Sequence, residues 1–235
     1  MKVAALISGG KDSALALYRA MKRGYDIKYL VTMIPQREDS WMFHYPNVHL
    51  TDLFAEACGI PLIKAETSGV KERELEDLKR TLIGLDIQGI VSGAVGSTYQ
   101  KRRIDMICAE IGLKSIAPLW GEDQMVLMEE LISEGFEVIF IGVYAYGLGR
   151  NWLGRRLDRQ TLNDLIELNR KYGISLIGEG GEYETLVLDA PYFKKRIKIL
   201  RHRIVWKGDS GYLLVDEAEL ERKIDIHAHF CARKS

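Results

Sequence analysis

The chain has 235 residues, which is enough to bury a substantial core either as one large domain or as two smaller ones. Apolar residues make up 47% of it and charged residues 28%, which excludes disordered, collagen-like and membrane-embedded classes of protein. The 33 basic and 33 acidic side chains balance, so no overall positive field would attract nucleic acid, and we do not expect such a partner.

No apolar stretch approaches the ~18 residues that are needed to cross a bilayer. The first residues lead directly into a strand-like run and do not resemble a signal peptide. We therefore expect a cytoplasmic protein without a membrane partner. Cys58, Cys108 and Cys231 are far apart and odd in number, which predicts reduced structural thiols and no disulfide framework.

Short apolar runs alternate with helix-like segments over the first 120 residues. Strands are predicted at residues 3–7, 27–33, 61–64, 89–93 and 114–116. Helices are predicted at residues 13–23, 48–58, 71–85 and 97–111. This alternation predicts an α/β fold with a doubly wound parallel sheet, in which ligands bind beyond the carboxyl ends of the strands.

The pattern changes after Trp120, where strand-like runs begin to follow one another. Helices are predicted at residues 123–133 and 159–172, and strands at residues 138–144, 184–188, 196–206 and 211–215. We therefore expect a smaller α+β region to follow the parallel sheet, with a boundary near residues 120–125 and tight packing between the two parts.

A glycine-rich loop lies between the first predicted strand and the first predicted helix. Its residues are Ser8, Gly9, Gly10, Lys11, Asp12 and Ser13. The two glycines let the backbone turn sharply, and the unpaired amides at the start of a helix attract anions. We expect Lys11 to add a mobile cation and Asp12 to suit Mg²⁺. The structural alternative is an ordinary turn in which Asp12 caps the helix.

The loop is neither a Walker A sequence nor a dinucleotide-binding GxGxxG sequence. It resembles the SGGxDS signature of the PP-loop ATP pyrophosphatases, which cleave ATP between its α and β phosphates and adenylate a substrate. The resemblance implies that ATP binds with Mg²⁺ at Asp12 and that the loop holds the leaving pyrophosphate. It also implies that adenine lies near Met33, at the end of the second strand.

The second distinctive stretch, SWMFHYPN, occupies residues 40–47 in the loop after the second predicted strand. Its large apolar side chains could anchor the loop to the core, with His44 as a structural side chain. Alternatively, the loop is an active-site lid in which His44 and Asn47 contact substrate or phosphate.

The third stretch, GEGGEYET at residues 178–185, places three glutamates among three glycines. In a strand, Glu182 and Glu184 would share a face, and a glycine turn would bring Glu179 near them. Such a cluster could hold Mg²⁺, take protons from an attacking amine or attract a cationic substrate. The alternative is a solvated acidic turn before a buried strand.

Together the three stretches resemble the diphthine–ammonia ligase family in its short archaeal form, over the chain to about residue 220. The resemblance implies an enzyme that amidates diphthine on translation elongation factor 2 with ammonium and ATP, which gives diphthamide. We expect an acyl-adenylate intermediate, with AMP and pyrophosphate as products. The family often has Thr where this chain has Tyr45, so we assign no role to that side chain.

The resemblance also implies the roles of individual residues. Catalytic roles fall to Lys11, Asp12, His44, Glu182 and Glu184. Contacts to ATP fall to Ser8, Gly9, Gly10, Lys11, Asp12, Ser13, Met33, Ser92 and Gly93. Contacts to the acceptor fall to Asn47, Gln100, Arg103, Glu179, Gly180, Gly181 and Thr185. We expect a PP-loop nucleotide-binding domain over residues 1–122, a smaller α+β substrate-binding domain over residues 123–225 and a tail over residues 226–235.

Two other functions are consistent with the loop. A PP-loop tRNA-modifying enzyme would share it. However, sulfur transfer would normally require paired cysteines, which are missing, and the neutral overall charge weakens tRNA binding. A module that binds ATP without cleaving it is the other alternative. His227, His229 and Cys231 alternate like metal ligands, but we interpret them as part of a frayed terminus. The sequence is compatible with a homo-oligomer and does not specify one.

Overall fold

The structure is a computed structural model of the chain, and it describes residues 1–35, 47–67 and 71–223. The strands and helices in chain order are β1 (Lys2–Leu6), α1 (Lys11–Lys22), β2 (Asp26–Pro35), α2 (Thr51–Cys58), β3 (Leu62–Thr67), α3 (Lys71–Leu82), β4 (Gly89–Val91), α4 (Thr98–Glu110), β5 (Lys114–Ile116), α5 (Gln124–Ser133), β6 (Glu137–Val143), α6 (Arg159–Tyr172), β7 (Tyr183–Asp189), β8 (Lys195–Lys207) and β9 (Ser210–Arg222). Short 3₁₀ helices, η1 (Val48–Leu50) and η2 (Arg150–Trp152), precede α2 and follow β6. No helix within these ranges is long and apolar enough to cross a membrane.

The first sheet is parallel throughout and has the strand order β3-β2-β1-β4-β5, which confirms the predicted doubly wound α/β fold. Its central strand, β1, buries Val3, Ala4 and Ala5 almost completely, as the unbroken apolar run predicts. The chain moves outward from β1 to β3 and then returns to place β4 on the other side of β1. The strand order therefore reverses between β1 and β4, and ligands bind at such a reversal in open α/β sheets.

The second sheet is antiparallel and has the strand order β7-β6-β9-β8. Its last strand, β9, continues to Arg222, although the sequence predicts a strand only over residues 211–215. The additional part is polar, so it gave no apolar signal. Opposite charges across the hairpin stabilise it instead, as in the pairs Arg196–Glu221 and Lys198–Glu219.

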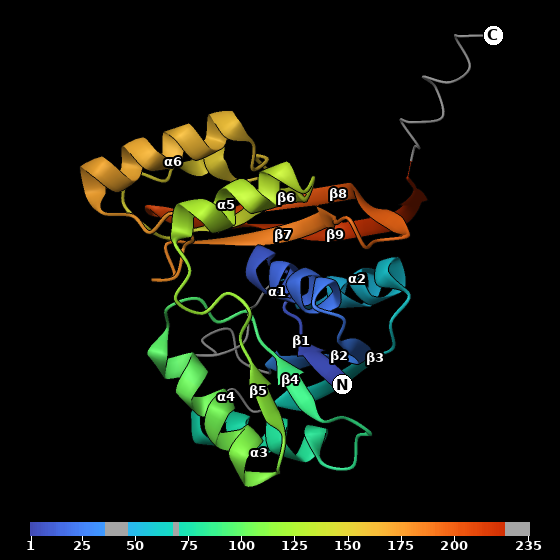
Figure 1. The fold of residues 1–235 in the computed structure, drawn as a ribbon. Helices are drawn as coiled ribbons and strands as arrows, with labels where there is room; N and C mark the ends of the chain where they lie inside the picture. The colour runs from blue at the N-terminus through green and yellow to red at the C-terminus, as the bar shows by residue number, and fades with distance from the viewer. Residues whose placement is uncertain (36–46, 68–70, 224–235) are drawn as a thin grey trace, which may run out of the picture.

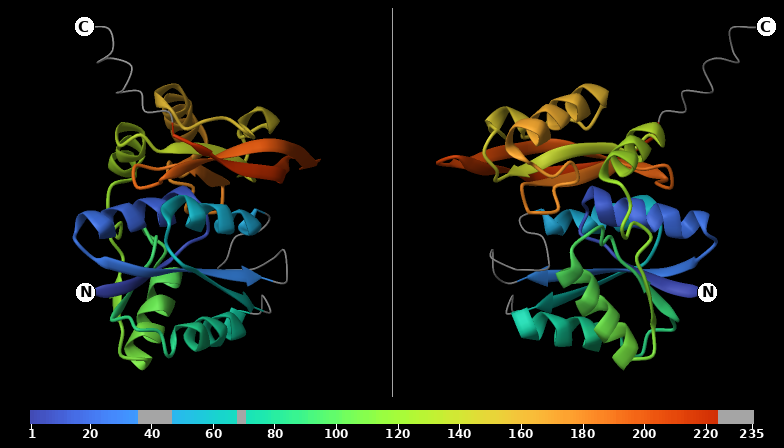
Figure 2. Two further views of the ribbon diagram at one scale, coloured as in Figure 1. Left: turned by 90° about the vertical axis from the view of Figure 1, so that its right-hand side faces the viewer. Right: turned by 60° about the vertical axis from the view of Figure 1, so that its left-hand side comes forward.

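Helices α1 and α2 lie between the two sheets, while α5 and α6 cover the outer face of the antiparallel sheet and α3 and α4 cover the far face of the parallel sheet (Figures 1 and 2). Because α1 is covered on both sides, four consecutive residues, 14–17, are fully buried, which a surface helix would not show. Phe54 of α2 meets Phe193 edge to face at 4.8 Å between ring centroids. A continuous apolar core therefore joins the two parts of the chain.

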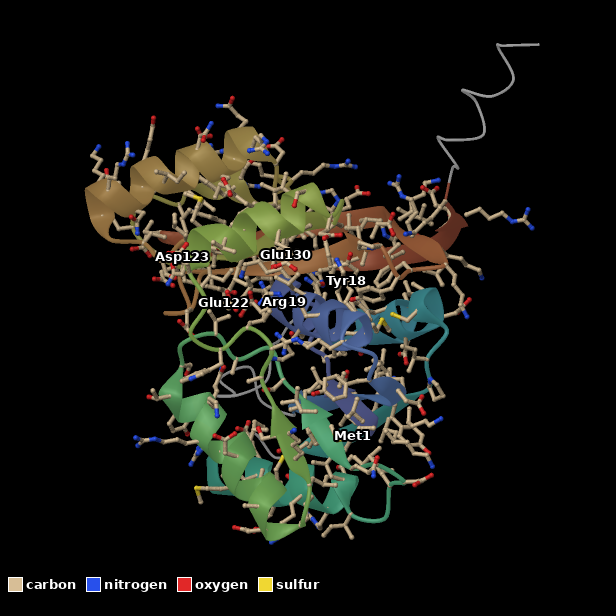
Figure 3. The ribbon with its side chains drawn as sticks, in the orientation of Figure 1. Met1, Tyr18, Arg19, Glu122, Asp123 and Glu130 are labelled. Carbon is tan, nitrogen blue, oxygen red and sulfur yellow. The ribbon has the colours of Figure 1, made fainter. Side chains whose placement is uncertain are left out.

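Arg19 of α1 joins the two parts through polar contacts as well (Figure 3). Its Nε and Nη2 donate to the Glu130 carboxylate of α5 at 3.0 and 2.6 Å, and its Nη1 donates to the main-chain carbonyl of Pro118 at 3.0 Å. Glu122 lies 3.4 Å from the same guanidinium. Asp123 caps α5 by accepting hydrogen bonds from the amides of Met125 and Val126.

Candidate functional site

A cavity of about 700 Å³ opens beyond the carboxyl ends of β1 and β4, where the strand order reverses. One wall comes from the parallel part of the chain, with the loop after β1, Met33 of β2, residues 92–95 after β4 and the start of α4. The other wall comes from residues 177–186, which lead into and form β7. The glycine-rich loop and the GEGGEYET stretch, far apart in the sequence, thus face the same cavity.

The glycine-rich loop makes a tight turn into α1. Gly9 has a φ of +87°, a left-handed conformation that disfavours any residue with a Cβ atom. The Ser8 hydroxyl accepts a hydrogen bond from the Gly10 amide at 3.3 Å, and the Ser13 hydroxyl donates to the Gly10 carbonyl at 3.0 Å. Both serines therefore stabilise the loop conformation, in addition to lining the cavity.

Gly93 lets the end of β4 approach the start of α1. A Cβ atom at this position would lie 2.7 Å from the Ser13 amide nitrogen and 2.8 Å from the Asp12 carbonyl carbon. Gly93, which is predicted to contact ATP, is thus also a point where the backbone after β4 closely approaches the start of α1. Any larger residue there would force one of the two backbones to move.

The antiparallel sheet supports the loop from the opposite side. The Val187 amide donates to the Gly9 carbonyl at 2.9 Å, and the Lys11 amide donates to the Thr185 hydroxyl at 3.2 Å. Thr185, for which the resemblance implies a contact to the acceptor, is buried and bonded to the loop. The backbone of β7 therefore helps to set the loop geometry.

Lys11 is only 3% exposed, so the expectation of a mobile cation is wrong. Its Nζ donates to the Ile177 carbonyl at 2.5 Å, lies 3.0 Å from Asp12 Oδ2 and sits 5.1 Å from the ring centroid of Tyr183. Burial, reinforced by the charge of Asp12, raises the pKa of Tyr183 far above its ordinary value. Ile177 and Tyr183 contact the lysine from a distant part of the chain, so the sequence around position 11 does not indicate its burial.

Asp12 has one carboxylate oxygen that no hydrogen bond satisfies among the residues that the structure describes. Its Oδ1 is buried and has no hydrogen-bond partner within the described ranges, and the same holds for the Ser92 hydroxyl. Both residues line the cavity. A buried carboxylate oxygen without a partner is costly, and a hard cation that also binds phosphate would remove that cost. The residues present therefore fit Mg²⁺ at Asp12.

The three glutamates of the GEGGEYET stretch make different contacts. Glu179 and Glu184 both line the cavity, and Glu179 Oε1 also accepts hydrogen bonds from the amides of Gly96 and Ser97 at the start of α4. Glu182 precedes β7, and its Oε1 accepts a hydrogen bond from the Ser175 amide at 3.0 Å. No group of three His, Cys, Asp or Glu residues among those described could hold a metal ion. The expectation that the three glutamates together could hold Mg²⁺ is wrong.

The remaining predicted residues divide between the cavity and its surroundings. Met33 and Gln100 line the cavity, as do Gly180 and Gly181, but Arg103 does not and lies instead 4.3 Å from the ring centroid of Tyr99. His44 falls outside the described residues.

Asn47 is 5% exposed, and both the nitrogen and the oxygen of its side-chain amide form hydrogen bonds. Its Nδ2 donates to the Leu213 carbonyl at 2.7 Å, and its Oδ1 accepts from the Val215 amide at 2.9 Å. The side chain thus binds the backbone of β9 at the edge of the cavity. Sequence reasoning missed Ile177 and Tyr183, which enclose Lys11, because their proximity to position 11 depends on the tertiary fold.

Two family models cover most of the chain. The diphthamide synthase N-terminal domain matches residues 1–115, and the diphthamide synthase C-terminal domain matches residues 123–220. The chain belongs to the diphthamide synthase family. The family assignment confirms the resemblance that the three sequence stretches indicate.

Curated relatives in this family are named diphthine–ammonia ligase. The Homo sapiens protein is 36% identical over 252 residues, a match covering 95% of this chain and 94% of that protein. The Schizosaccharomyces pombe protein is 36% identical over 237 residues, but the chain spans only 39% of its length. Among solved structures, a predicted subunit of tRNA methyltransferase from Methanocaldococcus jannaschii aligns with a TM-score of 0.45 at 18% identity, over 83% of this chain and 99% of that one.

Proposed function

We propose that the chain is an ATP-dependent ligase that amidates the carboxylate of diphthine on translation elongation factor 2 with ammonium. The observation that carries the proposal is the loop of residues 8–13 at the strand-order reversal, where Asp12 lines the cavity and has one unpaired carboxylate oxygen. Family membership supports the choice of acceptor, because relatives of nearly full coverage bear the name diphthine–ammonia ligase.

The proposed first step activates the acceptor. A carboxylate oxygen attacks the α-phosphorus of ATP, the bond to the bridging oxygen of pyrophosphate breaks, and an acyl-adenylate forms. The loop amides at the start of α1 would hold the leaving pyrophosphate. Mg²⁺ held by Asp12 would neutralise phosphate charge. Lys11 would act by fixing Asp12 and the loop, because its ammonium group is bonded to Ile177 and paired with Asp12.

The proposed second step forms the amide. Ammonium loses one proton to become ammonia, whose lone pair attacks the acyl carbon. The carbon–nitrogen bond forms, the carbon–oxygen bond to AMP breaks with its electrons on the phosphate, and the nitrogen loses a second proton. Glu184 is the glutamate of the third stretch that both lines the cavity and belongs to β7. We therefore propose that it binds the ammonium cation and accepts the first proton.

The test is an incubation with diphthine-bearing elongation factor 2, ATP and ¹⁵N-ammonium, followed by mass measurement of the acceptor. We expect labelled amide in the acceptor, with AMP and pyrophosphate in equal amounts. ADP and orthophosphate without AMP would contradict cleavage between the α and β phosphates. ATP binding without any turnover would favour a non-catalytic module instead. A parallel incubation with unlabelled glutamine, which should give no product, tests the nitrogen donor.

A further inference from the structure

Tyr144 lies immediately after β6, beside the glutamate that we place at the ammonium step. In the pairing of β6 with β7, Gly142 is opposite Glu184 and Val143 is opposite Tyr183. The Tyr144 amide extends this pairing by donating to the Glu182 carbonyl at 2.8 Å. The backbone of residue 144 is thus fixed relative to β7.

The Tyr144 side chain folds back over Gly142. A Cβ atom at Gly142 would lie 2.7 Å from the Tyr144 hydroxyl oxygen and 2.9 Å from Cε2 of its ring. Because Gly142 is paired directly with Glu184, the hydroxyl lies next to the Glu184 side chain. A glycine at position 142 is what leaves room for this arrangement.

The two side chains share a hydrogen bond. Burial of the hydroxyl, the charge of Glu184 and this hydrogen bond together raise the pKa of Tyr144 well above its ordinary value. The phenol therefore stays protonated at neutral pH and donates to the carboxylate, although 43% of the tyrosine residue is exposed.

We propose that Tyr144 is a positioning residue that holds the Glu184 carboxylate toward the cavity for the ammonium step. This inference rests on the proposed function, and it adds a residue that none of the three sequence stretches contains. A carboxylate in an extended strand can adopt several rotamers, and a fixed donor selects the one that can meet a cation in the cavity. Tyr144 is not among the described residues that line the cavity with the glycine-rich loop, so adenylation should not depend on it.

The test compares the wild type with Tyr144→Phe, which removes only the hydroxyl. We expect kcat/KM for ammonium to fall about 10- to 100-fold, mainly through a higher KM, because a hydrogen bond to a charged group is lost. ATP–pyrophosphate exchange with the acceptor should remain near the wild-type rate. Hydroxylamine, which is neutral at pH 7 and needs no carboxylate to collect it, should trap the acyl-adenylate equally well in both proteins.

Tyr146→Phe is the matched control, because Tyr146 is 80% exposed and stacks edge to face on Tyr172 at 5.1 Å. Its kinetic parameters should equal those of the wild type. Gly142→Ala provides an independent approach, since the added methyl would displace the Tyr144 ring and should raise the KM for ammonium without removing any polar group. Combining it with Tyr144→Phe should give little further effect.

Two results overturn the inference alone. Equal ammonium kinetics in the wild type and Tyr144→Phe would overturn it while leaving the proposed function intact. A parallel loss of pyrophosphate exchange and amide formation would show that Tyr144 has only a structural role. Absence of ammonium-dependent product from the wild type would instead overturn the proposed function together with this inference.

Discussion

The ammonium group of Lys11 donates a hydrogen bond to the main-chain carbonyl of Ile177, 2.5 Å away and 166 positions later in the chain. Lys11 is the first residue of α1, and Ile177 belongs to the connection between α6 and β7. A single buried cation thus connects the glycine-rich loop with the opposite wall of the cavity.

Lys11→Ala should reduce both turnover and stability. The substitution leaves the Ile177 carbonyl without its donor and Asp12 without its cation in a buried setting, which should cost about 1–3 kcal/mol of unfolding free energy. Turnover should fall by ~10²–10³ because Asp12 and the loop are no longer held. Urea unfolding and AMP release measure the two effects, with Lys22→Ala on the exposed end of α1 as control. Unchanged stability with lost turnover would show that the ammonium group acts on phosphate directly.

Asp12→Asn should weaken the dependence of ATP binding on Mg²⁺. The neutral amide cannot supply a carboxylate oxygen to the cation, while the hydrogen bonds of Ser8 and Ser13 with Gly10 involve other atoms and should persist. Calorimetric titration of ATP at several Mg²⁺ concentrations should show a lower apparent affinity for the cation. Asp86→Asn, on the exposed side chain that pairs with Lys2, should titrate like the wild type. An unchanged Mg²⁺ dependence in Asp12→Asn would show that Asp12 does not bind the metal.

Glu184→Gln and Glu182→Gln should differ, although the sequence assigns both residues to catalysis. Glu184→Gln should keep ATP affinity and lose amide formation, because the cavity loses the carboxylate proposed to take a proton from ammonium. In Glu182→Gln the amide oxygen can still accept from the Ser175 amide, so the loss should be smaller. ATP binding and ¹⁵N incorporation, measured in parallel, separate the two. Loss of ATP binding in Glu184→Gln would instead indicate a nucleotide or metal role.

Arg19→Ala should destabilise the contact between α1 and α5. The substitution removes the paired hydrogen bonds from the guanidinium to the partly buried Glu130, which should lower the unfolding free energy by about 1.5–3 kcal/mol. Lysine cannot reproduce the bidentate geometry, so Arg19→Lys should recover little of the lost stability. A double-mutant cycle with Glu130→Ala measures the coupling between the two residues. Additive effects would show that Arg19 acts through Pro118 and Glu122 alone.

Asp158 should make stability depend on pH below its ordinary carboxyl pKa. The Thr161 amide donates to this carboxylate at the start of α6 and lowers the pKa of Asp158 from 3.8. The folded-state pKa is thus below the unfolded one, so this stabilisation is present above about pH 4 and is lost as the pH falls through the folded-state value. Asp158→Asn keeps an acceptor without titrating. Between pH 6 and pH 3, urea midpoints should fall more for the wild type than for Asp158→Asn; equal falls would contradict the prediction.

The parallel sheet was predictable because its signals are local. The apolar run of β1, the two glycines after it and the alternation of strands and helices each depend on neighbouring residues. The extension of β9 to Arg222 was not predictable, since it depends on charges contributed by the partner strand β8. Within the site, the sequence identified the loop and the GEGGEYET stretch. It could not show that Lys11 is enclosed or that Glu179 contacts α4, because both depend on segments that meet only after folding.

The hydrogen bond from Val187 to Gly9 has a consequence for how the two halves of the molecule can be used. β7 is the edge strand of its sheet, and an uncovered edge is a site where other chains can pair. Here the glycine-rich loop occupies part of that edge. An isolated amino-terminal half would therefore lack the hydrogen bond that holds this loop, and an isolated carboxyl-terminal half would expose an edge strand prone to aggregation. Swapping halves between homologues should succeed only where both sides of this contact are exchanged together.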